Sequence, residues 1–236
     1  SMRKTQYYMI FIVGDSWGCG CWTEEQTVYH RGLEQLLHDD GYKVINLSQG
    51  GCDLKTMTSR LDDHLMLLKY RPPLWFTEPV TKILVMQTEW HRHLSTINEK
   101  DADEQVEIAS FYGTLSYLSK KYNLPINVIG GCSDTVWLDD FENYYPGVTV
   151  VCQSVTNLLV NDDHRTDEPV YSVRYPKNFI TNYQRMIEAE LSQKREHVWR
   201  ENPQWFFPDG CHPNQLAHEK LYSHLKKEKV ITEEKN

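Results

Sequence analysis

No stretch of this 236-residue chain is long and apolar enough to span a lipid bilayer. Basic residues are not in excess either, because 25 Lys and Arg stand against 33 Asp and Glu, a formal net charge of −8. That balance argues against a general nucleic-acid or anionic-membrane binder, while leaving room for a local basic pocket. The chain also lacks an internal repeat or a linker that would divide it. We therefore expect one domain over residues 1–236, with no membrane partner and no general nucleic-acid partner.

We expect no secretion signal either, because the first apolar run is short and polar residues precede it. Without such a signal, the six cysteines of a chain this large are better explained as reduced thiols than as disulfides. We expect a cytoplasmic protein. Five of the cysteines come just after predicted elements at one edge of the fold: Cys19, Cys21, Cys52, Cys132 and Cys211. Small apolar packing is the preferred interpretation, and a metal or redox-sensitive cluster is the alternative.

Apolar runs and amphipathic stretches alternate along the chain, in a composition of 40% hydrophobic and 25% charged residues that is typical of a globular protein. Runs rich in β-branched residues predict strands at residues 8–13, 42–47, 82–86, 125–130 and 148–151. Amphipathic spacing predicts helices at residues 24–38, 54–70, 101–122, 179–199 and 214–227. In the last of these helices, Leu216, Leu221 and Leu225 are expected to face inward. The alternation predicts an α/β fold with a parallel sheet covered on both faces.

Residues 158–177 fit no regular element, since they are polar and include aromatic residues and prolines. We interpret them as a loop insertion that forms either a lid, a partner surface or a solvated loop, the last being the most common case.

Two short segments carry residues suited to chemistry. Gly14-Asp15-Ser16-Trp17 follows the first predicted strand, so Ser16 is expected at the carboxyl end of a central strand, where open α/β sheets form ligand crevices. Near the other end of the chain, Asp209 and His212 lie three residues apart in a turn-forming context. A serine, a histidine and a carboxylate are the parts of an activated hydroxyl nucleophile.

These two segments resemble the motifs of the SGNH/GDSL serine hydrolase family. Gly-Asp-Ser alone is a common match, but the segment Asp209-Gly210-Cys211-His212-Pro213-Asn214 is more specific. The resemblance runs over nearly the whole chain. It implies a three-layer α/β/α sandwich around a flavodoxin-like, mostly parallel five-stranded sheet. It also implies that Ser16 is the nucleophile, that His212 is its general base and that Asp209 orients the imidazole, with no metal or organic cofactor.

The second block of the family is a glycine, and Gly51 fits that place best. The backbone N–H groups of Gly51 and Ser16 would then stabilise the oxyanion of an acyl-transfer reaction, and a side chain at residue 51 would obstruct the approach. The alternative is an ordinary turn glycine.

The third block departs from the family. Glu89 stands where the family has an asparagine, and an ionised carboxylate cannot donate a hydrogen bond to an oxyanion. Gln87 supplies the missing amide N–H, or Glu89 binds a polar substrate group or pairs with Arg92, or the oxyanion hole has fewer donors; all three interpretations are open. His91 and His93 beside Glu89 form a weak metal-ligand pattern, and we prefer the interpretation that they line a polar pocket or face solvent to a metal site.

The resemblance implies cleavage of a carboxylic ester through an acyl-enzyme, with a small-molecule or carbohydrate-linked acyl ester as substrate. Side chains in or beside the motifs are candidate substrate contacts: Asp15, Trp17, Glu89 and Arg92. Two alternatives are an acyltransferase with the same triad and a catalytically silent binding protein with the same fold, the latter favoured by the Glu89 departure. The sequence does not indicate an oligomeric state.

Overall fold

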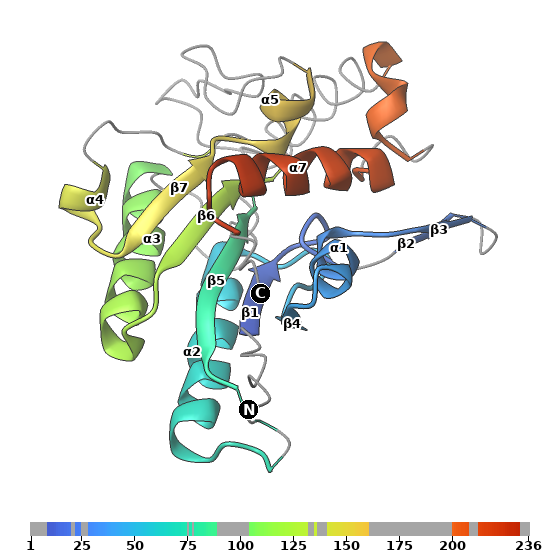
Figure 1. The fold of residues 1–236 in the computed structure, drawn as a ribbon. Coiled ribbons are helices and arrows are strands. Elements are labelled where there is room, and N and C mark those ends of the chain that lie inside the picture. Colours follow the sequence, from blue (N-terminus) through green and yellow to red (C-terminus); the bar gives the residue numbers. More distant parts are fainter. Residues whose placement is uncertain are drawn as a thin grey trace.

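The computed structural model describes residues 9–19, 22–24, 28–74, 76, 78–88, 104–131, 135, 141–160, 200–207 and 212–231. A five-stranded parallel sheet with the order β4-β1-β5-β6-β7 forms its centre (Figure 1). The strands are β1 (Met9–Gly14), β4 (Lys43–Asn46), β5 (Val80–Gln87), β6 (Ile126–Gly130) and β7 (Val148–Cys152). This order is the flavodoxin-like order of doubly wound sheets. All five strands predicted from the sequence are confirmed, with ends that agree within two residues.

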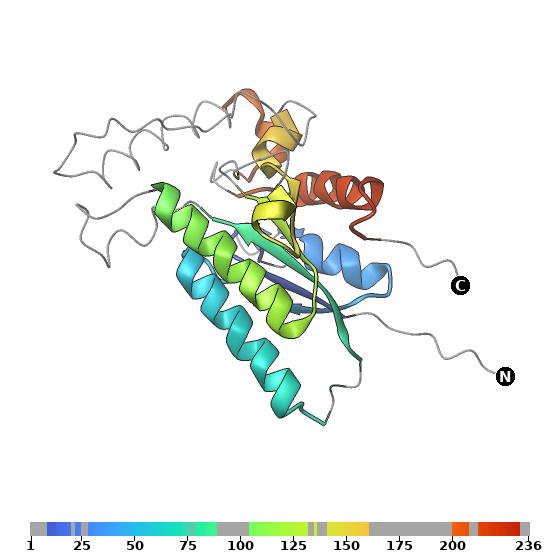
Figure 2. The same ribbon diagram turned by 90° about the vertical axis from the view of Figure 1, so that its left-hand side faces the viewer.

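Helices cover both faces of the sheet, which gives the expected three α/β/α layers. Helices α2 (Leu54–Tyr70) and α3 (Glu104–Tyr122) lie on one face, and α1 (Leu33–Asp39) and α7 (Gln215–Lys227) lie on the other (Figure 2). Residues 9–13 of the central strand β1 are at most 4% exposed, as expected for a strand covered on both sides. No helix in the described ranges combines the length and the apolar character that crossing a membrane requires.

The helix predicted over residues 24–38 is wrong in its first half. Strands β2 (Trp22–Glu24) and β3 (Val28–His30) pair as a separate antiparallel ribbon instead. Because β3 consists of a β-branched, an aromatic and an imidazole residue, it suits a strand at least as well as a helix. Helix α1 begins only after Gly32, whose backbone N–H donates to Oε1 of Gln35 at 2.9 Å and so receives a partner at the helix start.

Three further short elements were not predicted: α4 (Phe141–Tyr144), α5 (Val155–Val160) and the 3₁₀ turn η3 (Pro203–Trp205). Helix α5 takes up the first three residues of the insertion predicted at 158–177, so that part of the prediction is wrong. The rest of the insertion and the helix predicted at 179–199 lie outside the described residues.

One predicted core position of α7 is also wrong. Leu221 and Leu225 are at most 1% exposed, whereas Leu216 is 54% exposed. Residues 216 and 221 are five apart, so a turn of 100° per residue places them about 140° apart around the helix. Leu216 therefore lies outside the apolar stripe of α7 that faces the sheet.

Gly130 supports a prediction about packing. A Cβ at Gly130 would overlap the backbone carbonyl oxygen of Gln153 just beyond β7, so a methyl group forces one strand to move. We expect Gly130→Ala to lower the free energy of unfolding by about 1–3 kcal/mol, measured by urea denaturation. Gly113 is the control, because a Cβ added there, within α3, meets no atom within 4 Å. Gly113→Ala should raise stability by about 0.5–1 kcal/mol, and equal losses in both variants would contradict the packing.

Candidate functional site

Ser16 lies in a tight turn at the carboxyl end of β1. The backbone N–H of Gly18 donates to the carbonyl oxygen of Asp15 at 3.1 Å, and that of Trp17 donates to Oδ1 of Asp15 at 2.9 Å. Asp15 and Trp17 are each 2% exposed, whereas Ser16 between them is partly buried. The turn therefore buries both neighbours of the serine. Because β4 and β5 lie on opposite sides of β1, the turn also marks the point where the strand order reverses.

Residues from both neighbouring strands hold this turn. Oγ1 of Thr88, directly after β5, donates to Oδ2 of Asp15 at 2.7 Å. Nδ2 of Asn46, the last residue of β4, donates to the carbonyl oxygen of Gly18 at 2.9 Å. The approach is close, since a Cβ at Gly18 would lie 2.6 Å from Oγ of Ser48. The Ser16 turn is thus anchored to β4 at one end and to β5 at the other.

The segment before α7 pairs with itself on either side of residues 208–211. Phe206 and Pro213 form an antiparallel bridge, and the backbone N–H of Phe207 donates to the carbonyl oxygen of His212 at 2.9 Å. His212, whose carbonyl oxygen takes part in this pairing, is partly buried.

An aromatic contact joins this segment to the Ser16 turn. The ring of Trp17 meets the ring of Phe206 edge-on, with 6.3 Å between the centroids. Trp17 follows Ser16 in the chain, and the bridge partner of Phe206 follows His212. The structure thus brings together the two segments that carry the predicted serine and histidine, although they come from opposite ends of the sequence.

The start of α7 is fixed by its capping residue. Oδ1 of Asn214 accepts from the backbone N–H of Ala217 at 3.1 Å, which satisfies one of the first free donors of the helix. The side-chain amide of Asn214 donates to the carbonyl oxygen of Gln204 at 2.7 Å. The backbone N–H of Asn214 donates to the carbonyl oxygen of Trp205 at 2.9 Å. Asn214 therefore ties the His212 segment to both α7 and η3.

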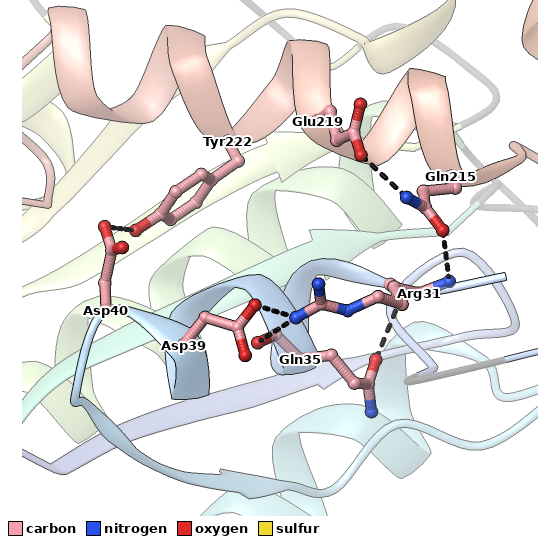
Figure 3. Close-up of polar contacts among 8 residues, drawn as sticks. Arg31, Gln35, Asp39, Asp40, Gln215, Glu219 and Tyr222 are labelled. Carbon is pink, nitrogen blue, oxygen red and sulfur yellow. Dashed lines mark hydrogen bonds and ion pairs between the residues drawn. The ribbon is translucent and has the colours of Figure 1, made fainter.

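Helices α1 and α7, which follow the two motif segments, are joined by polar contacts (Figure 3). Near their starts, the backbone N–H of Arg31 donates to Oε1 of Gln215 at 3.3 Å. Near their ends, Asp40 accepts a hydrogen bond from the Tyr222 hydroxyl and pairs with Lys226 at 2.6 Å. The bonds from Lys226 and Tyr222 hold the pKa of Asp40 below its ordinary value. These contacts fix α7, and the segment before it, relative to α1.

Gln87, the candidate amide donor, ends β5 and is 4% exposed. Its Oε1 accepts a hydrogen bond from the hydroxyl of Tyr112 at 2.6 Å, so the oxygen of the carboxamide faces α3 and its NH₂ end is turned away from that hydroxyl. Tyr112 is itself fully buried and packs edge-on against Phe141, with 4.8 Å between centroids. The donation from Gln87 to an oxyanion stays a prediction.

Gly51 lies exposed in the loop after β4, in the left-handed region with φ = 73°. A Cβ added to it would meet no atom within 4 Å. Backbone conformation, and not crowding within the protein, therefore explains the glycine at this position. The role of its N–H in an oxyanion hole stays a prediction.

Asp209, Glu89 and Arg92 lie outside the described residues, as do His91 and His93, so their roles stay predictions. The substrate contacts of Asp15 and Trp17 also stay predictions. In the structure, the Asp15 carboxylate accepts hydrogen bonds from the Trp17 backbone and from Thr88, and the Trp17 ring packs against Phe206. Across the described ranges, no three His, Cys, Asp or Glu side chains gather as a metal site would require.

Three described cysteines, Cys19, Cys52 and Cys152, are free thiols. Burial, and then the nearby charge of Asp15, raise the pKa of the Cys19 thiol, so it stays protonated at neutral pH. A protonated thiol is a poor nucleophile and metal ligand, which favours the packing interpretation for Cys19.

Sequence reasoning missed Thr88 and Asn46. Both are polar residues at the carboxyl end of a strand that neighbours β1. The available signal was the expected sheet order, because polar residues that follow the two neighbours of a central strand lie closest to the loop after it.

No protein-family model and no curated protein matches the sequence. Among solved structures, the chain is similar to the psychrotrophic esterase EstA from Pseudoalteromonas sp., with a TM-score of 0.45 and 16% identity over 94% of this chain and 99% of that chain. It is also similar to LAE5, an α/β hydrolase from the metagenome of Lake Arreo, Spain (TM-score 0.47, 10% identity, 95% of this chain and 96% of that chain). The chain is also similar to a candidate SGNH hydrolase from Slackia heliotrinireducens, with a TM-score of 0.37 and 12% identity over 94% of this chain and 100% of that chain. Because these TM-scores and sequence identities are low, the argument for an activity rests on the residues of this chain and not on these similarities.

His218 lies inside α7, six residues after His212. It is 3% exposed, and neither ring nitrogen has a hydrogen-bond partner in the part of the chain that the structure describes. Burial lowers the pKa of His218 to about 4, so its ring is neutral in the folded protein at pH 7.

This burial predicts an acid-dependent loss of stability. Between pH 6.5 and 4 the unfolded chain binds a proton at residue 218 that the folded chain does not, so stability falls as the pH falls through that window. We expect the wild type to lose about 3 kcal/mol more than His218→Leu between pH 7 and pH 4, measured by urea unfolding. Parallel losses in the two proteins would show that His218 takes no part.

Proposed function

We propose that this chain is a serine ester hydrolase of the SGNH type. Ser16 is the nucleophile, His212 is the general base and then the general acid, and Asp209 orients the imidazole. The substrate is a small-molecule or carbohydrate-linked acyl ester.

The packing of Trp17 on Phe206 is the observation that carries this proposal. It links the Ser16 turn to the segment in which Phe206 pairs with Pro213, the residue after His212. The turn also lies at the reversal of strand order, where doubly wound sheets bind their ligands. A serine and a histidine in two segments held against each other there support acyl chemistry.

The reaction proceeds in two halves. Oγ of Ser16 attacks the ester carbonyl carbon while His212 takes its proton, and the backbone N–H groups of Ser16 and Gly51 stabilise the oxyanion. The bond to the alcohol oxygen then breaks, and the alcohol leaves with the proton from His212. Water attacks the acyl-enzyme with His212 again as base, which releases the carboxylic acid and restores Ser16. The side-chain amide of Gln87 is the candidate for a third oxyanion donor.

Substitution of Ser16 tests the proposal. We expect Ser16→Ala to lower hydrolysis of p-nitrophenyl acetate and butyrate by about 10³-fold or more, because no other group replaces the nucleophile. A fluorophosphonate probe should label the wild type at Ser16, as read by peptide mass spectrometry. Ser48→Ala is the control: its hydroxyl lies at the same sheet edge without a hydrogen-bond partner among the described residues, and its loss should leave turnover within about threefold.

Each other outcome removes one part of the proposal. Turnover by Ser16→Ala at the wild-type rate would exclude Ser16 as nucleophile. A wild-type chain that neither labels nor hydrolyses esters would be a silent binding protein. Transfer of the acyl group to an added alcohol or amine in preference to water would make the chain an acyltransferase.

A further inference from the structure

A side-chain hydrogen bond crosses the reversal point of the sheet, between the end of β1 and the end of β5. Oγ1 of Thr88 donates to Oδ2 of Asp15 at 2.7 Å, and the two residues are 3% and 2% exposed. We propose that Thr88 is a positioning residue for Ser16, which it holds in place through the carboxylate of Asp15. This inference rests on the proposed function, since it assigns Thr88 a part in the same reaction.

The Asp15 carboxylate is the link between the serine turn and β5. Its Oδ1 accepts from the backbone N–H of Trp17 at 2.9 Å, a bond that spans Ser16, and its Oδ2 accepts from Thr88. Hydrogen bonds to an ionised acceptor are the stronger kind, and a buried carboxylate with donors on both oxygens has a fixed orientation. The position of Thr88 therefore sets where the bond from Trp17 is made.

The bonds inside the turn give it its shape but not its place on the sheet. The bond from Gly18 to the Asp15 carbonyl oxygen closes the turn, and Asn46 ties its far end to β4. Thr88 ties its near end to β5, the strand that leads into the predicted third block. Thr88 thus fixes the spacing between the serine turn and the segment expected to complete the oxyanion hole.

This spacing matters to the reaction in two ways. A nucleophile displaced by about 1 Å can lose on the order of 10²-fold in rate, because the attack geometry is lost. The Asp15 charge also lies one residue from Ser16, and a carboxylate free to swing toward a developing oxyanion would repel it. Both effects act on the transition state more than on substrate binding.

Two substitutions of Thr88 separate its hydroxyl from its shape. Thr88→Val keeps the size and removes the donor, and we expect kcat to fall about 10-fold or more with KM within about twofold. Thr88→Ser keeps the donor, and we expect kcat within about threefold of the wild type. Circular dichroism and thermal melting verify that the Val variant is folded. If Thr88 acted on stability alone, kcat of the folded Val variant would be unchanged.

Asp15 provides the second control. In an Asp15→Ala background the bond no longer exists, so Thr88→Val should lower kcat by no more than about twofold further. Should Thr88→Val yield little folded protein, Thr88→Ala removes the same hydroxyl without placing a methyl group beside the carboxylate, and the same expectation holds.

The outcomes distinguish this inference from the proposed function. An active wild type with unchanged kcat in Thr88→Val overturns the inference and leaves the proposed function standing. Equal losses in the Val and Ser variants, or full additivity with Asp15→Ala, also overturn it, because the hydroxyl or its bond would not be the cause. A wild type that neither hydrolyses esters nor labels at Ser16 overturns both.

Discussion

The edge-on contact of Trp17 with Phe206 is the interaction on which the candidate site depends, because it joins a turn near residue 16 to a segment near residue 212. Neither partner is held by that contact alone. The turn is anchored to β4 and β5, while the C-terminal segment is fixed by its own bridge and by the cap of α7. The α1–α7 contacts then hold the two following helices together. The site is thus built from short local structures brought into one place by tertiary packing.

Two buried ionisable groups, Asp15 and His218, differ in their hydrogen-bond partners. Asp15 receives a hydrogen-bond donor on each carboxylate oxygen, which offsets part of the cost of burying it. His218 has no partner for either ring nitrogen among the described residues and is therefore neutral, with a lowered pKa. The protein thus supplies partners for the buried carboxylate at the Ser16 turn and keeps the buried imidazole of His218 neutral.

The sequence predicted the sheet because each of its strands is a short apolar run between turn residues. The two motif segments were chosen for their residue types, and the roles of Ser16, His212 and Asp209 stay predictions. Residues 24–38 misled because Val28 fits the apolar face of a helix and also a strand, and pairing with β2 decided between them. The inward orientation predicted for Leu216 was wrong because the sequence does not show which face of α7 packs against the sheet. The Thr88–Asp15 bond could not be read from the sequence, since the two residues are 73 apart and only the strand order brings them together.

The structure of the protein after reaction with a fluorophosphonate is the most direct test of this account. The phosphorus atom should be bonded to Oγ of Ser16, a ring nitrogen of His212 should lie within about 3 Å of an oxygen of the adduct, and Asp209 should accept from the other ring nitrogen. Phosphorus on any other residue, or a His212 ring separated from the adduct by the Trp17–Phe206 pair, would contradict it.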